Sequence, residues 1–159
     1  MAQFYFPEEE NLTPFTAGQT EAVRKAVALL QEANLSCDWE PSTSGLSFLC
    51  DGGMTAENGV MGYVSYLRPR RILIARFVAE QLTWESRGVP NNEFAMAIVV
   101  HELTHVKQRK WWRGLAWPIL NIPGIDRLTL EKWAVRNQTA AEDYLRDRYS
   151  AMRRGIENN

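Results

Sequence analysis

The sequence has few cysteines, no surplus of positive charge and no long apolar run. Its two cysteines, Cys37 and Cys50, are too few for a disulfide scaffold and fit a reducing compartment. The 18 basic and 19 acidic residues give a net charge of −1, so the basic excess of a nucleic-acid binder is missing. No run of 18 apolar residues occurs, and no membrane-spanning helix is expected.

The first residues lack the features of a signal peptide. MAQFYFPEEENL has neither a positive stretch nor an apolar core, so we expect a cytoplasmic or otherwise intracellular, soluble protein. The segment 111–125, WWRGLAWPILNIPGI, contains Arg113 and is broken by Pro118 and Pro123. We expect a loop there that is buried or faces a partner, with contact to a membrane surface as the weaker alternative.

Length and composition predict one domain, spanning residues 1–159. The chain is 45% hydrophobic, which suits a single sizeable core, and no repeat or linker divides it. Residues 1–14 are expected to form an irregular N-terminal arm. Thr16 and Gln19 form a capping-box pattern for a helix through about residue 34, and LSFLC at 46–50 is typical of a short strand.

The remaining pattern predicts a hairpin followed by helices. Segments 60–67 and 71–75 are candidate strands joined through Pro69, and residues 76–86 are expected to be helical. Asn91 or Asn92 can cap a helix that runs to about residue 110. Asp126 or Thr129 can cap a last helix that runs to about residue 154. This order, with few strands, predicts the α+β class.

Both histidines of the chain lie in one helical segment, HELTH, at residues 101–105. His101 and His105 are four residues apart, so they share a helix face and can bind one ion. Glu102 is rotated by about 100° from His101, from where it can reach a metal-bound water without being a ligand. This is the HExxH pattern of two zinc ligands and a general base. Zinc lowers the pKa of its water towards ~7, and the base takes the proton as the water attacks a carbonyl.

The alternative is a core helix with two incidental histidines. The side chains around the motif are apolar: Phe94, Met96, Ile98, Val99, Val100, Leu103 and Val106. A charged Glu102 in a buried helix is costly unless a partner compensates it, and a zinc-bound water is such a partner. The pattern therefore favours the metal site.

The third zinc ligand must be another residue type, because the chain has no further histidine. A catalytic site usually has three protein ligands and one open position, so a carboxylate or a cysteine is needed if water does not take the place. The last helix offers Glu131, Glu142 and Asp143. Glu142 lies eleven residues after Glu131, close to three turns, so the two share nearly one face and both stay open.

HELTHVKQ followed by LEKWAVRNQ resembles the gluzincin-type zinc metallopeptidases, which are HExxH zincins. The likeness is greatest to the short, single-domain minigluzincins of bacterial or phage-like type, in which an HExxHxxQ helix is followed by a helix beginning Leu-Glu-x-x-Ala. It covers about residues 60–145. It implies a zincin-like fold with a small, mostly antiparallel sheet, an N-terminal helix, a central HExxH helix and a long C-terminal helix that supplies the third ligand.

The same resemblance implies the roles of the site residues. His101, His105 and Glu131 would hold one Zn²⁺ per chain, and Glu102 would be the general base in the hydrolysis of peptide bonds. Ala134 would be the small residue of the second motif. An edge strand, 63–67 or 71–75, would pair with an extended peptide or protein substrate.

The sequence departs from the family pattern at one position. Many gluzincins have Asp four residues after the ligand glutamate, where it orients the first histidine, and this chain has Val135. A zinc-bound histidine normally donates its second N–H to an acceptor, so another group must serve His101. Four residues are candidates for steadying the tetrahedral intermediate of the hydrolysis: Tyr63, Tyr66, Tyr144 and Arg136.

Two other functions compete with the peptidase. The departure at Val135 favours a catalytically inactive zinc-binding interaction module of the same fold. Glu102 argues against it, because a structural zinc site needs no base. A peptide-deformylase-like amide hydrolase would use Cys50 as the third ligand, but FLCDGG does not resemble the cysteine motif of that family. Substrate specificity and oligomeric state are not indicated by the sequence.

Overall fold

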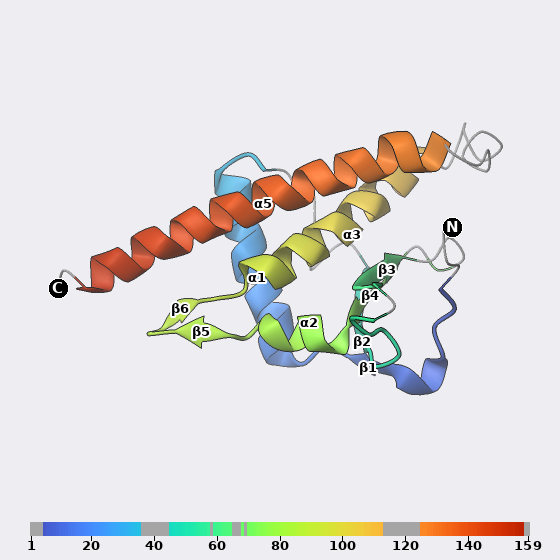
Figure 1. Cartoon of the computed structure of the whole chain (residues 1–159), viewed down its shortest axis with the longest axis horizontal. Helices are drawn as coiled ribbons and strands as arrows, with labels where there is room; N and C mark the ends of the chain where they lie inside the picture. The colour runs from blue at the N-terminus through green and yellow to red at the C-terminus, as the bar shows by residue number, and fades with distance from the viewer. Residues whose placement is uncertain are drawn as a thin grey trace.

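Four α-helices and a small sheet that lies to one side of them make up the part of the chain that the computed structural model describes (Figure 1). That part comprises residues 5–35, 45–57, 59–64, 68, 70–112 and 125–157, with the backbone alone at 109–112 and 125–130. In chain order the elements are η1 (Glu9–Asn11), β1 (Leu12–Pro14), α1 (Ala17–Glu32), β2 (Ser47–Asp51), β3 (Gly62–Val64), β4 (Arg71–Ala75), α2 (Arg76–Gln81), β5 (Glu85–Ser86), β6 (Val89–Pro90), α3 (Glu93–Trp112) and α5 (Ile125–Glu157). The predicted α+β class is confirmed.

The main sheet has the strand order β1-β2-β4-β3. β1 pairs with β2 and β3 with β4 in antiparallel fashion, whereas β2 and β4 are parallel over five residue pairs. The hairpin expected from 60–67 and 71–75 is confirmed for β3 and β4. The sheet expected to be mostly antiparallel is mixed. Because β4 lies inside the sheet, β3 is the candidate edge strand and 71–75 is not.

Two short elements differ from the expectation. The arm at 1–14 is not irregular throughout, because Leu12–Pro14 pairs with β2 as β1. The helix expected at 76–86 ends at Gln81, and a small hairpin of β5 and β6 follows. Arg87 and Gly88 turn this hairpin with φ values of 54° and 76°, the positive values that a two-residue type I′ turn requires.

Helix α1 begins with the predicted capping box. The Thr16 hydroxyl accepts from the backbone N–H of Gln19 at 3.1 Å, and the Gln19 side-chain oxygen accepts from the Thr16 N–H at 2.9 Å. The helix then buries one apolar face, with Val23, Val27 and Leu30 in the core. The sequence alone predicted this helix, because its capping box and its apolar face lie within one continuous segment.

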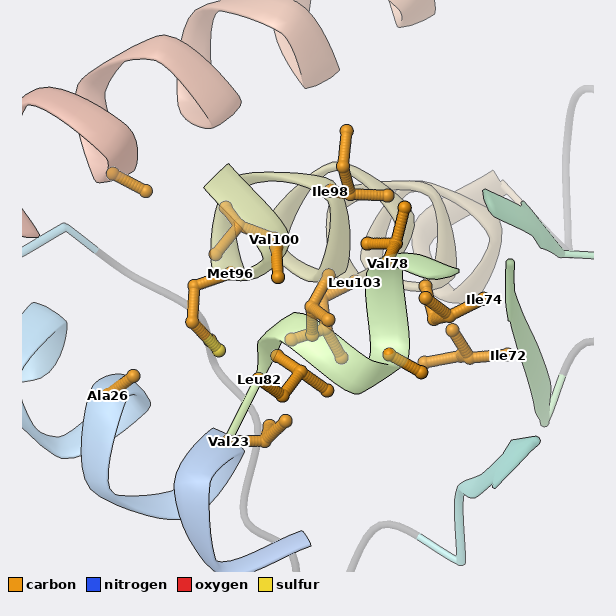
Figure 2. Close-up of a cluster of buried hydrophobic side chains, with 14 of the residues drawn as sticks. Val23, Ala26, Ile72, Ile74, Val78, Leu82, Met96, Ile98, Val100 and Leu103 are labelled. Atoms are coloured by element: carbon orange, nitrogen blue, oxygen red, sulfur yellow. The ribbon is translucent and has the colours of Figure 1, made fainter. Parts of the chain in front are cut away.

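Helix α3 lies at the centre of the core (Figure 2). Its apolar side chains meet those of α1, α2 and β4, and the labelled members of this cluster are Val23, Ala26, Ile72, Ile74, Val78, Leu82, Met96, Ile98, Val100 and Leu103. The HELTH motif is in the C-terminal half of this helix. Its backbone is therefore fixed by packing on several sides.

Helix α5 runs antiparallel to α3 and packs along it (Figure 1). Its C-terminal half is held at the start of α3, where the buried Tyr149 hydroxyl donates to Asn92 Oδ1 at 2.9 Å. Asn92 directly precedes α3, as predicted, but its side chain also donates to the Leu82 carbonyl at 2.7 Å. Helix α5 begins at Ile125, so neither Asp126 nor Thr129 is its N-cap.

Among the described residues, no helix has both the length and the apolar content needed to cross a membrane. The expected loop and membrane-surface contact at 111–125 lie mostly outside those residues. Cys37 and Tyr66 lie outside them as well.

Candidate metal centre

Three side chains from α3 and α5 meet at one point. His105 Nε2 lies 3.1 Å from His101 Nε2 and 3.0 Å from Glu131 Oε1, and His101 Nε2 lies 3.4 Å from Glu131 Oε2. They form a group that could hold a metal ion. The structure thus brings together the two histidines of the motif and the more distant Glu131. The antiparallel crossing of the two helices produces this meeting.

Each histidine is oriented through its other ring nitrogen. His101 Nδ1 lies 2.9 Å from the side-chain oxygen of Gln138, and His105 Nδ1 lies 3.0 Å from that of Gln108. An amide oxygen only accepts hydrogen bonds, so the proton of each neutral imidazole belongs on Nδ1. Both Nε2 atoms then present lone pairs to each other and to the Glu131 carboxylate. A cation is the natural partner for such an arrangement.

The spacing fits a tetrahedral ion. With metal–ligand distances of about 2.0–2.2 Å, neighbouring ligand atoms of a tetrahedral zinc site are about 3.3–3.6 Å apart, within a few tenths of an ångström of the distances observed here. The three distances between His101, His105 and Glu131 are 3.0, 3.1 and 3.4 Å. Two imidazoles and one carboxylate are also a donor set of catalytic zinc, which keeps a fourth position open. The residues present therefore fit the implied metal.

The electrostatics of the group also favour positive charge. Burial lowers the pKa of His101, but the hydrogen bond with Glu131 and the charges of Glu102 and Glu131 outweigh it, so the pKa is raised overall. His101 and His105 donate to Glu131 from Nε2 when their rings are protonated, and these hydrogen bonds hold the pKa of Glu131 well below its usual range. Glu131 is thus a carboxylate at neutral pH, which is the form that binds metal.

Glu102 lies outside the ligand group and is only 5% exposed. Its carboxylate lies against the backbone of Gly62 in β3. The Glu102 side chain is therefore enclosed between the motif helix and the edge strand, next to the histidine pair that shares its helix. This placement matches the separation of base from ligands that the HExxH spacing predicts.

The alternative ligands have other contacts. Glu142 and Asp143 both form ion pairs with Arg146, and the Glu142 pair is the solvated i, i+4 pair expected of a surface helix. Cys50 is buried in β2, where its Sγ lies 3.7 Å from Gln19 Oε1. Within the described part of the chain, none of the three belongs to the metal-binding group.

Gln138 is a residue of this site that the sequence analysis missed. Gln138 accepts the hydrogen bond of His101, the role for which the family pattern has an aspartate at the position of Val135. The Val135 side chain is 50% exposed. Asn137, beside it, donates to the Thr104 hydroxyl at 3.2 Å and joins α5 to the motif helix. The sequence spacing could have identified Gln138, because it follows Glu131 by seven residues, or two turns, and so shares its helix face.

Two of the four candidates for the residue that would steady the tetrahedral intermediate pack against other side chains. Tyr63 packs edge-on against Tyr5, with ring centres 5.8 Å apart, and Tyr144 packs against the core. Arg136 is exposed, and Tyr66 lies outside the described residues.

Comparison of the chain with protein-family models, with curated proteins and with solved structures gives no match.

Proposed function

We propose that the protein is a zinc-dependent metallopeptidase of the gluzincin type. In this proposal His101, His105 and Glu131 hold one zinc ion, and Glu102 is the general base. The observation that supports it best is the convergence of two imidazole lone pairs and one carboxylate, with distances of 3.0–3.4 Å, from two separate helices. A core helix with incidental histidines would not need either the carboxylate from α5 or the two glutamines behind the rings.

The roles follow from the positions of the side chains. When bound, zinc polarises the scissile carbonyl and makes water acidic enough to attack near neutral pH. Glu102 takes the proton of the attacking water and passes it to the amide nitrogen as the C–N bond breaks. The water oxygen enters the new carboxyl group. Gln108 and Gln138 hold the imidazoles with their Nε2 atoms directed towards the ion.

Among the described residues no strand pairs with the outer edge of β3, which supports a peptide as substrate. The Met61 carbonyl accepts from the Ala75 N–H at 2.9 Å, so Met61 faces β4. Hydrogen-bonding direction alternates along an antiparallel strand, and the backbone groups of Gly62 and Val64 therefore point away from β4. An extended peptide can pair there as an added strand, beside Glu102.

An inactive zinc-binding module is less well supported than a peptidase. Its main argument was the missing aspartate at Val135, and Gln138 offers His101 an acceptor instead. A purely structural site also has no use for a buried carboxylate next to the ligands.

The proposal is tested by incubating the purified protein with a peptide library and detecting cleaved bonds by mass spectrometry. Cleavage should stop with a zinc chelator and return with added zinc. Glu131→Ala should lose both zinc and cleavage, whereas Glu142→Ala, on the same helix, should keep both. Cleavage that persists in Glu131→Ala, or zinc loss confined to Glu142→Ala, contradicts the proposed ligand set.

A further inference from the structure

The edge strand lies against the proposed base at Gly62. A Cβ atom added to Gly62 would lie 2.7 Å from both Cγ and Oε1 of Glu102 and 2.9 Å from Cδ. Such separations are far below van der Waals contact, so no side chain fits at position 62 while Glu102 keeps its place. The strand backbone thus forms one wall of the space that the Glu102 carboxylate occupies.

The backbone conformation does not explain this glycine. Gly45, Gly59 and Gly88 have positive φ values of 59°, 68° and 76°, a region that side chains disfavour. Gly62 is not among the positive-φ residues and lies within β3, so an alanine could adopt its conformation. The contact with Glu102 is therefore the specific reason for the missing side chain.

We infer that Gly62 is a positioning residue, which sets the place of the Glu102 carboxylate beside the metal centre. This inference rests on the proposed function. Strand β3 is held to β4 by its pairing, and α3 is fixed by the core, whereas Cγ, Cδ and Oε1 of Glu102 belong to a side chain that can rotate about several bonds. A methyl group at position 62 would therefore move the carboxylate rather than the strand. The ligands His101, His105 and Glu131 lie outside this contact and would keep the metal.

The inference is tested with Gly62→Ala in the full chain. Bound zinc should stay at about one ion per chain and KM within a few-fold, while kcat falls by about 100-fold, the effect of a catalytic group displaced by ~1 Å. Gly18→Ala is the matched control, because its added methyl group would meet nothing closer than 3.7 Å. That variant should keep the wild-type kcat.

A second variant separates displacement from general damage. Glu102→Asp shortens the base by one methylene group and should lower kcat in the wild-type background. In the Gly62→Ala background the shorter side chain relieves the contact, so Glu102→Asp should cost little or restore activity. Equal losses in both backgrounds, or full kcat in Gly62→Ala, would overturn the inference.

A crystal structure of metal-free Gly62→Ala gives a readout that does not depend on activity. The Glu102 carboxylate should be displaced by about 1 Å or more, with β3 and the two histidines unmoved. A carboxylate in its original place beside a shifted strand would overturn the inference. If instead Glu102→Gln is as active as the wild type, the proposed function fails, and the crystal structure still decides whether Gly62 places the carboxylate.

Discussion

Zinc should stabilise the fold strongly, because the three proposed ligands join two helices. His101 and His105 belong to α3, and Glu131 comes from the first part of α5. A ligand that binds the folded state alone stabilises it by about 4 kcal/mol at 1,000 times its Kd. For a chain of 159 residues, each kcal/mol shifts the melting temperature by about 2–4 °C, so zinc should raise it by about 8–16 °C.

The assay is thermal unfolding followed by circular dichroism, with the protein first stripped by a chelator and then titrated with zinc. Glu131→Ala should lose most of the zinc-dependent shift, since one of three ligands is gone. Glu142→Ala is the matched control and should keep the full shift, because Glu142 pairs with Arg146 on the surface of the same helix. A melting temperature that does not respond to zinc, or a full response in Glu131→Ala, would refute the reasoning.

Further predictions concern Gln138, which contacts the ring of His101, and Tyr149, which joins α5 to the residue before α3. Gln138→Ala should lower zinc affinity by about 10–100-fold, measured by competition with a chromophoric chelator, because His101 loses its acceptor. Tyr149→Phe removes the donor to Asn92 and should lower the free energy of unfolding by about 1–3 kcal/mol in urea, with zinc content unchanged. Burial raises the pKa of Tyr149 to about 12, so the stability that its hydroxyl provides should be present below pH ~10 and lost as the pH rises through 12. Unfolding measured across this range should show a loss that is absent from Tyr149→Phe.

The motif helix could be predicted from sequence because its signals are local. The apolar periodicity, the preceding asparagines and the HExxH spacing all lie within residues 91–110, and α3 spans Glu93–Trp112. The relative position of the two helices is not a local property. Glu131 and Glu142 share a face, but they are about 16 Å apart along α5, at 1.5 Å per residue. The contact of Tyr149 with Asn92 helps to set which of them lies opposite the histidines.

The strand pairings of the sheet could also be predicted only where they are local in the sequence. The antiparallel pair of β3 and β4 follows from two runs close in sequence, whereas the parallel pairing of β2 with β4 spans more than 20 residues and has no local signature. β1 has only three residues and includes Pro14, so no alternating pattern identifies it. Its strand character comes from pairing with β2.

Glu102→Gln tests most directly whether Glu102 is the base of a zinc peptidase, as we propose. The amide keeps nearly the same size and leaves the three ligands intact but cannot take a proton from water. We predict about one zinc ion per chain in both proteins, with peptide hydrolysis by the wild type and a loss of at least about 100-fold in the variant. Equal hydrolysis by the two zinc-loaded proteins would contradict the account.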